Sequence, residues 1–276
     1  HPAELCGVNE PAVYHFIKGR LPLLVSVPHD GRLIPDDVAV GMTDVALGLP
    51  DTDWHVARLY AFARQLGASL LIANYSRYVV DLNRPADDGA LYPGQLATGL
   101  CPSRTFGGEP LYKDARDVAA DELARRVERY WQPYHSRLAE ELDGLRARHG
   151  TALLWDAHSI ASQVPTLFDG KLPDLNIGTN DGKSCAPLVQ AAITEAAESS
   201  PFSVAVNGRF RGGYITRHYG QPAAGVYAVQ LELSQSCYLD ESSLRYDAGK
   251  AERLIESLTT MLQAFVDSAE SKRSGT

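Results

Sequence analysis

The sequence predicts an α/β fold, a single domain over residues 1–276 with a mixed, mainly parallel central sheet flanked by helices on both faces. Two observations predict this class. Short apolar runs of strand length alternate with longer stretches of helical spacing, an order typical of sheets covered by helices on both sides. No internal repeat, low-complexity tract or linker divides the 276 residues, of which 45% are apolar and 22% charged, enough for a sizeable core.

Six apolar runs are predicted to form the strands. The first reads LPLLVSV and runs into a turn at Pro28–Gly31, as a buried strand does. The last reads VYAVQLEL and alternates between apolar and polar residues. The predicted strands are residues 21–27, 69–73, 75–82, 153–156, 202–206 and 226–233.

Four stretches are predicted to form helices. The first carries Val56, Leu59 and Ala63 at helical spacing, and Gly67 ends it. The second is charged and amphipathic, and Pro133 is expected to kink or split it. The predicted helices are residues 51–66, 112–149, 186–197 and 248–268.

Three irregular segments separate these elements. Residues 85–110 are rich in Gly, Pro and Asp, residues 158–183 lack a clear period, and residues 209–220 are rich in Gly and Arg. Long loops inside a compact domain are usually functional, so we expect the chemistry of the protein to lie beside them.

Composition excludes several classes of function. A net charge of −8 argues against a nucleic-acid partner, and no apolar run is long enough to span a membrane. The four cysteines are far apart and are expected to be reduced thiols of a cytoplasmic protein. The strings GxGxxG, GxxxxGK[ST], HExxH and GxSxG are all missing, so the common nucleotide-binding, zincin and serine-hydrolase motifs do not apply.

Polar residues follow or interrupt the predicted strands. His29, the pair Asn83-Arg84 and His158 each come after a strand, and Glu232 lies inside the last one. Ligands of open α/β sheets bind at this edge. Two histidines and a carboxylate brought together there make a three-ligand zinc site with a fourth position for water. Glu232 would then carry a proton between that water and a leaving amine.

Each of these residues also has a purely structural interpretation. Either histidine could be a hydrogen-bonded core residue, and Arg84 could form a local ion pair with Asp81. Glu232 could bond a core tyrosine or arginine, because an unpaired buried carboxylate costs several kcal/mol. The residue types alone leave these alternatives open.

Seven strings together resemble the N-formylglutamate amidohydrolase family, over most of the chain from about Leu21 to about Tyr238. In order they are VPHDGRLIP, DTDWHV, SRYVVDLNRP, LYPG, DAHS, RGGYITRHYG and LELSQ. The family is similar to the zinc carboxypeptidases and to the aspartoacylase and succinylglutamate desuccinylase group. The resemblance therefore implies a zinc carboxypeptidase-like (phosphorylase/hydrolase-like) architecture with a mixed eight-stranded sheet.

The resemblance implies one zinc ion per chain, with His29 and His158 as ligands. Carboxypeptidases carry a ligand glutamate three residues after the first histidine, but Arg32 stands at that position here. Asp53 is the acidic ligand that matches the family. Asp51 and Asp30 remain alternatives for this third ligand.

The resemblance also implies how an acidic substrate is held. Asn83-Arg84 would bind its α-carboxylate, since the guanidinium fork suits a bidentate grip. A second carboxylate calls for Arg217 or Arg211, with Arg77 behind them. The substrate-orienting candidates in the same loop are His218 and Tyr214, and Gly212 and Gly213 would let that loop approach the ligand.

The implied reaction is the zinc-dependent hydrolysis of N-formyl-L-glutamate to formate and L-glutamate, in histidine degradation. Glu232 would act first as general base and then as general acid. The alternatives are an amidohydrolase of another N-acyl acidic amino acid, a carboxypeptidase-like peptidase, and a non-catalytic protein that binds an acidic amino acid. In each case the partner is a small anionic molecule.

Overall fold

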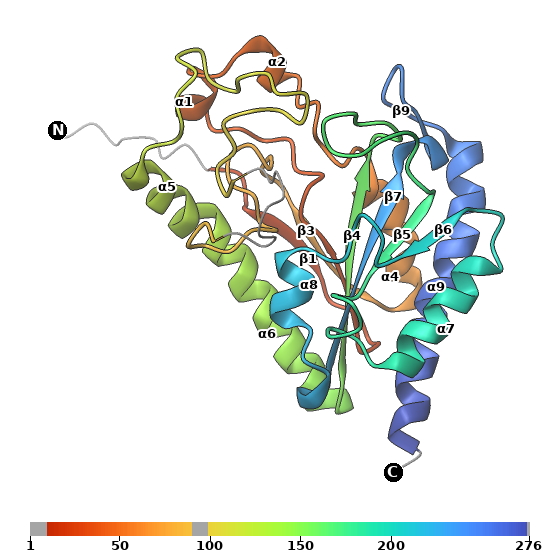
Figure 1. The fold of residues 1–276 in the computed structure, drawn as a ribbon. Coiled ribbons are helices and arrows are strands. Elements are labelled where there is room, and N and C mark those ends of the chain that lie inside the picture. The colour runs from red at the N-terminus through yellow and green to blue at the C-terminus, as the bar shows by residue number, and fades with distance from the viewer. Residues whose placement is uncertain (1–9, 90–98, 275–276) are drawn as a thin grey trace.

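The computed structural model describes residues 10–89 and 99–274, and within them it contains one large sheet (Figure 1). The seven strands of this sheet lie in the order β1-β3-β2-β4-β7-β5-β6. They are β1 (Tyr14–Ile17), β2 (Leu23–Val27), β3 (Ser69–Ala73), β4 (Ala152–Ile160), β5 (Leu175–Gly178), β6 (Val204–Val206) and β7 (Val226–Ser234). A separate hairpin joins β8 (Leu239–Asp240) to β9 (Arg245–Tyr246). The LYPG string, residues 91–94, and Cys6 lie outside the described residues.

The pairing of the strands confirms a mixed, mainly parallel sheet. The central pairs β3·β2, β2·β4 and β4·β7 are parallel, and so is β5·β6 near one edge. The pairs β1·β3 and β7·β5 are antiparallel. The described sheet has seven strands, so the expectation of eight was wrong for this part of the chain.

Helices cover both faces of the sheet, as predicted (Figure 1). The helical elements are α1 (Asp36–Ala39), α2 (Asp44–Leu47), α3 (Val56–Leu59), η1 (Tyr60–Phe62), α4 (Ala63–Leu66), α5 (Ala120–Arg126), η2 (Val127–Trp131), α6 (Gln132–His149), α7 (Pro187–Glu198), α8 (Tyr214–Tyr219), η3 (Pro222–Ala224), η4 (Gln235–Cys237) and α9 (Ala248–Ser274). Side chains of β4 alternate between two cores: Leu153 and Trp155 pack with α3, α7 and α9, and Leu154 packs with α6 and α8.

The predicted helix over residues 112–149 begins later than expected and is not broken at its proline. It starts at Ala120, and its middle, η2, is a single π-helical segment. Pro133 follows directly, in the first turn of α6, where a missing N–H costs least. The helical path therefore continues through the proline by a change of hydrogen-bond register.

The predicted strand over residues 75–82 was wrong. Tyr75 forms only an isolated bridge to Leu33, and the chain then turns, with Val79 N–H donating to Ser76 O at 2.9 Å. The apolar side chains of this segment are buried in a hydrophobic core, although its backbone is not part of a described strand. The strands β1 and β5 and the short helix α8 lie in segments where no such element was predicted.

The strands β4 and β7 lie side by side at the centre of the sheet, and all nine residues of each are buried. β4 is longer than predicted and runs to Ile160, so His158 lies within the strand rather than after it. In the parallel register His158 is the partner of Glu232. Paired residues project to the same side of a sheet, which places the two side chains next to each other.

Among the described residues, no helix is both long enough and apolar enough to cross a bilayer. The longest, α9, spans 27 residues but carries charged side chains along its length.

Candidate metal centre

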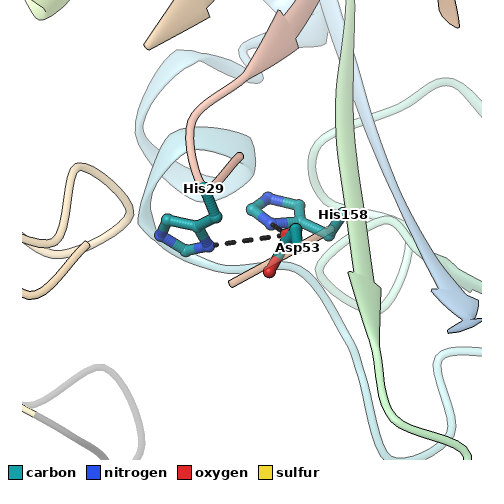
Figure 2. A group of neighbouring side chains, drawn as sticks. All are labelled: His29, Asp53 and His158. Carbon is teal, nitrogen blue, oxygen red and sulfur yellow. Dashed lines mark hydrogen bonds and ion pairs between the residues drawn. The ribbon is translucent and has the colours of Figure 1, made fainter. Parts of the chain in front are cut away.

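Three buried side chains from separate parts of the chain converge at one point (Figure 2). His29 follows β2, Asp53 precedes α3, and His158 lies in β4. One ligand atom from each lies within 4.8 Å of the other two. Asp53 Oδ2 is 3.1 Å from His158 Nδ1 and 3.8 Å from His29 Nδ1.

The sheet and one loop bring these residues together. Parallel β2 and β4 are neighbours, so their carboxyl ends deliver the two histidines to the same edge. The N–H of Asp53 donates to the carbonyl of His29 at 3.0 Å, which ties the loop to the end of β2. Asp30 holds the loop from the other side, since its carboxylate accepts from the N–H groups of His55 and Ala57 where α3 begins.

A second carboxylate stands behind each histidine. His29 Nε2 lies 2.6 Å from Asp81 Oδ1, and His158 Nε2 lies 2.6 Å from Asp156 Oδ2. Metal-binding histidines are typically oriented by such partners, which leave the other ring nitrogen for the ion. Two imidazole nitrogens and one carboxylate oxygen, with this support behind them, fit a divalent ion of the zinc type.

The alternatives for the acidic ligand, Asp51 and Asp30, form hydrogen bonds to other parts of the chain. Asp51 Oδ2 accepts from Tyr78 O–H at 2.6 Å and from Phe106 N–H at 2.9 Å. Asp30 supports the start of α3 as described above. The geometry therefore supports Asp53 as the carboxylate of the centre.

The surroundings of the centre shift the pKa values of the two histidines in opposite directions. Burial lowers the pKa of His29, and the charge of Arg77 lowers it further. Burial also opposes protonation of His158, but Asp156 and Asp53 raise its pKa well above the ordinary value. The two carboxylates on either side of His158 therefore favour its protonated form.

Two of the aspartates that contact the histidines, Asp53 and Asp81, stay ionised. Burial alone would raise the pKa of Asp53, but the hydrogen bond from His158 and the charges of His29 and Arg77 lower it. Burial would also raise the pKa of Asp81, but His29 and Arg77 hold it well below its usual range.

Glu232 lies beside the centre on β7, opposite His158. Its side chain is buried, and burial raises its pKa to about 8. Within the described residues no hydrogen bond joins its carboxylate to a tyrosine or an arginine, so the structural alternative for Glu232 is not observed. A carboxyl with a pKa near neutrality can both accept and release a proton.

Asn83 and Arg84 occupy a turn fixed to the centre and to α8. The N–H of Asn83 donates to Asp81 Oδ1 at 2.9 Å, and Asn83 Oδ1 accepts from the N–H of Ile215 at 2.9 Å. Trp131 Nε1–H donates to the carbonyl of Arg84 at 2.9 Å. The turn thus joins the partner of His29 to the amino end of α8.

The two arginines predicted to bind the second substrate carboxylate differ in their surroundings. Arg217 is half-buried, and its Nε–H donates to the carbonyl of Gly212 at 2.7 Å. Arg211 is exposed and lies 3.4 Å from Asp181. Tyr214 stacks on the exposed His218 with ring centroids 4.9 Å apart.

The glycines of that loop are packed against protein. A Cβ on Gly213 would lie 2.2 Å from Asn83 Nδ2, and Gly212 has a φ of +107°. The loop therefore lies in close contact with Asn83, and its approach to a ligand stays a prediction.

Three supporting residues were not assigned to the centre by the sequence. Asp156 lies two residues before His158 in DAHS, and Asp81 lies two residues before Asn83 in DLNRP. Arg77, expected behind the arginines of the 209–220 loop, instead contacts Asp53 and Asp81. Of these three residues, only Asp156 has a sequence pattern that indicates its role, the spacing of an aspartate two residues before a histidine in DAHS.

Comparison with known proteins places these features in a family. The sequence model of N-formylglutamate amidohydrolase matches residues 21–239. The chain is 50% identical over 258 residues to an N-formylglutamate deformylase of Pseudomonas putida, covering 92% of this chain and 96% of the relative. It is 52% identical over 257 residues to an N-formylglutamate deformylase of Pseudomonas aeruginosa, covering 89% and 96%. The crystal structure of an N-formylglutamate amidohydrolase from Ralstonia eutropha JMP134 superposes with a TM-score of 0.79 at 25% identity, covering 96% of this chain and 100% of that one.

Proposed function

The chain belongs to the N-formylglutamate amidohydrolase family, and on that premise we propose that it hydrolyses N-formyl-L-glutamate to formate and L-glutamate. The observation that carries the proposal is the convergence of His29, Asp53 and His158 beside Glu232. We place the reaction in histidine degradation, where it releases free glutamate from the formylated amino acid.

His29, Asp53 and His158 are proposed to hold one zinc ion per chain, through the ring nitrogens and carboxylate oxygen that face one another. When bound, zinc supplies a Lewis acid and makes water more acidic at neutral pH. Asp81 and Asp156, which lie within hydrogen-bonding distance of Nε2 of the two imidazoles, are proposed to orient the rings so that Nδ1 faces the ion.

Glu232 is the proposed general base and general acid. It accepts a proton from the water that attacks the formyl carbon. As the C–N bond breaks, it gives this proton to the departing nitrogen, so formate and glutamate leave and the carboxylate is regenerated. A buried carboxyl whose pKa is about 8 is suited to both steps near neutral pH.

Two cationic groups are proposed to hold the substrate. Asn83-Arg84 takes the α-carboxylate, from a turn that is fixed to the centre through Asp81. Arg217 is favoured over Arg211 for the side-chain carboxylate, because it is half-buried in α8 next to the turn, while Arg211 is exposed and paired with Asp181. Tyr214 and His218 complete the contact surface of α8. A formyl group is small, so these contacts must supply most of the orientation.

The proposal is tested by measuring metal content together with formate release from N-formyl-L-glutamate. We expect about one zinc per chain and turnover far above that of the N-acetyl and N-succinyl analogues. Preferred release of acetate or succinate would identify another acyl group. Binding of N-formyl-L-glutamate without turnover would identify a non-catalytic protein.

Replacing Glu232 by Gln tests the proton-transfer role. We expect kcat to fall by about 10²–10⁴-fold while substrate still binds, because the general acid–base step is removed. Glu195→Gln on the exposed face of α7 is the matched control and should keep full activity. Undiminished kcat in Glu232→Gln would remove this residue from the mechanism.

A further inference from the structure

A buried arginine lies among the carboxylates of the centre and has no part in the proposed reaction. Arg77 is only 8% exposed. Its Nη1 lies 3.4 Å from Asp53 Oδ1, and its Nη2 lies 3.3 Å from Asp81 Oδ2. One guanidinium therefore bridges the proposed acidic ligand and the carboxylate that orients His29.

The oxygens that Arg77 leaves free are the ones that face the histidines. Asp53 uses Oδ1 for Arg77 and turns Oδ2 toward His158 Nδ1. Asp81 uses Oδ2 for Arg77 and turns Oδ1 toward His29 Nε2. Because a carboxylate is planar, fixing one oxygen also fixes where the other points.

Packing holds the guanidinium itself in place. Its carbon lies 4.8 Å from the centroid of the Phe106 ring, and Nη1 also lies 3.3 Å from the carbonyl of Asp51. The side chain of Asp51 in turn accepts from Tyr78 O–H and Phe106 N–H. Two like-charged buried carboxylates repel each other, and a fixed cation between them offsets that repulsion.

We propose that Arg77 is a positioning residue that presents Asp53 and, through Asp81, His29 to the metal ion, and so sets the affinity of the centre for it. The inference rests on the proposed metal-dependent function. It concerns metal binding directly and does not require Arg77 to touch the substrate.

The test compares Arg77→Met and Arg77→Lys with the wild-type chain. Zinc affinity is measured by competition with a chelating dye on metal-free protein, alongside the visible spectrum of the cobalt-loaded protein. We expect Arg77→Met to weaken zinc binding by about 10–100-fold, as loss of an outer partner of a metal ligand does. Arg77→Lys should fall in between, because an ammonium keeps the charge but cannot bridge both carboxylates.

Arg137→Met is the matched control. Arg137 also lies near two carboxylates, those of Glu140 and Glu141, and packs over a phenylalanine ring, that of Phe16, but on α6 away from the centre. Its removal should lower thermal stability and leave zinc affinity and the cobalt spectrum unchanged.

The possible failures are distinguishable. A wild-type chain that binds no divalent metal overturns both the metal centre and the role of Arg77. Wild-type metal binding with unchanged affinity in Arg77→Lys and Arg77→Met overturns only the role of Arg77. If Arg77→Met does not fold, Arg77→Lys alone decides, and wild-type affinity together with a wild-type cobalt spectrum in that variant overturns the role.

Discussion

At the scale of single residues, the centre combines groups whose pKa values move in opposite directions within a small buried space. Burial raises the pKa of Glu232 to about 8, whereas Asp53 and Asp81 are kept ionised by His29, His158 and Arg77. Perturbed groups of this kind are typical of functional sites, because catalysis needs a proton donor and a fixed charge side by side.

The raised pKa of Glu232 makes the stability of the metal-free protein depend on pH. The folded chain retains this proton up to about pH 8, whereas an unfolded glutamate loses it near its ordinary value of 4.5. The contribution is thus fully present below pH 4.5 and is lost as the pH rises to 8. Metal-free Glu232→Gln should melt higher than metal-free wild type at pH 8, and the gap should close at pH 4.5. Thermal unfolding in the presence of a chelator measures the melting temperatures of the two chains at each pH. A difference that does not change with pH would contradict the raised pKa of Glu232.

The proton on His158 should compete with the metal. Asp156 and Asp53 raise the pKa of this imidazole well above its ordinary value, so zinc must displace a proton to bind. We expect zinc affinity to fall by about tenfold for each unit of decreasing pH below neutrality, from one displaced proton. Dye competition between pH 6 and 8 measures the slope, and an affinity independent of pH would refute the displacement.

The residues of the centre were only partly predictable from the sequence. His29, Asp53 and His158 were expected to converge, and the structure places them together. The partners of the histidine rings were not foreseen. Asp81 reaches His29 from residues 75–82, which turn instead of forming the predicted strand, and such tertiary geometry leaves no local pattern.

At the scale of secondary-structure elements, predictions succeeded where apolar pattern and length agreed. The long buried runs became β2, β3 and β7, and the amphipathic stretch at the C-terminus became α9. The strand β5 has only four residues, including an asparagine and a glycine, and is defined by its pairing with β7. Residues 75–82 are as apolar as a strand, but they fill a core between elements.

The junction between the 81–84 turn and α8 can be tested with one methyl group. Gly213 has a φ of −85°, which alanine tolerates, but its Cβ would lie 2.2 Å from Asn83 Nδ2. Gly213→Ala should therefore displace Asn83, raise KM for N-formyl-L-glutamate and cost about 1–3 kcal/mol of stability, as overpacking does. Metal content should stay the same.

Gly41→Ala provides the control for this substitution, because the nearest atom to its Cβ is 3.7 Å away. Steady-state kinetics and thermal unfolding of both variants, with elemental analysis, separate the effects. An unchanged KM in a folded Gly213→Ala chain would show that Asn83 does not bind substrate.

At the scale of the whole molecule, the sheet separates the side chains of the centre from the apolar core beneath α7 and α9. Asp156, His158 and Glu232 alternate with residues that pack against α7 and α9, and so project toward the side of α6 and α8. The face covered by α9 carries a continuous apolar core. Stability and activity should therefore respond to different substitutions.

Phe265→Ala in α9 tests this separation. Phe265 is fully buried, and its ring centroid lies 6.0 Å from that of Trp155. The substitution should lower the free energy of unfolding by about 3–5 kcal/mol. The kcat and KM of the folded fraction should match those of wild type at a temperature where both chains are folded. Chemical denaturation and kinetics at that temperature measure the two, and a changed kcat would show that the α9 face is coupled to the centre.

The π-helical segment Val127–Trp131 takes one extra residue into the helical path from Ala120 to His149. Ahead of it, Arg126 holds the carbonyl of Val79; after it, His135 holds that of Leu82. Because a π-helical turn takes up one residue more than an α-helical turn, removing one residue from the segment should restore ordinary α geometry with α5 and α6 in nearly the same orientation. A deletion within α6 would instead rotate the parts on either side of it by about 100°, so both contacts survive a single deletion best when it falls in this segment.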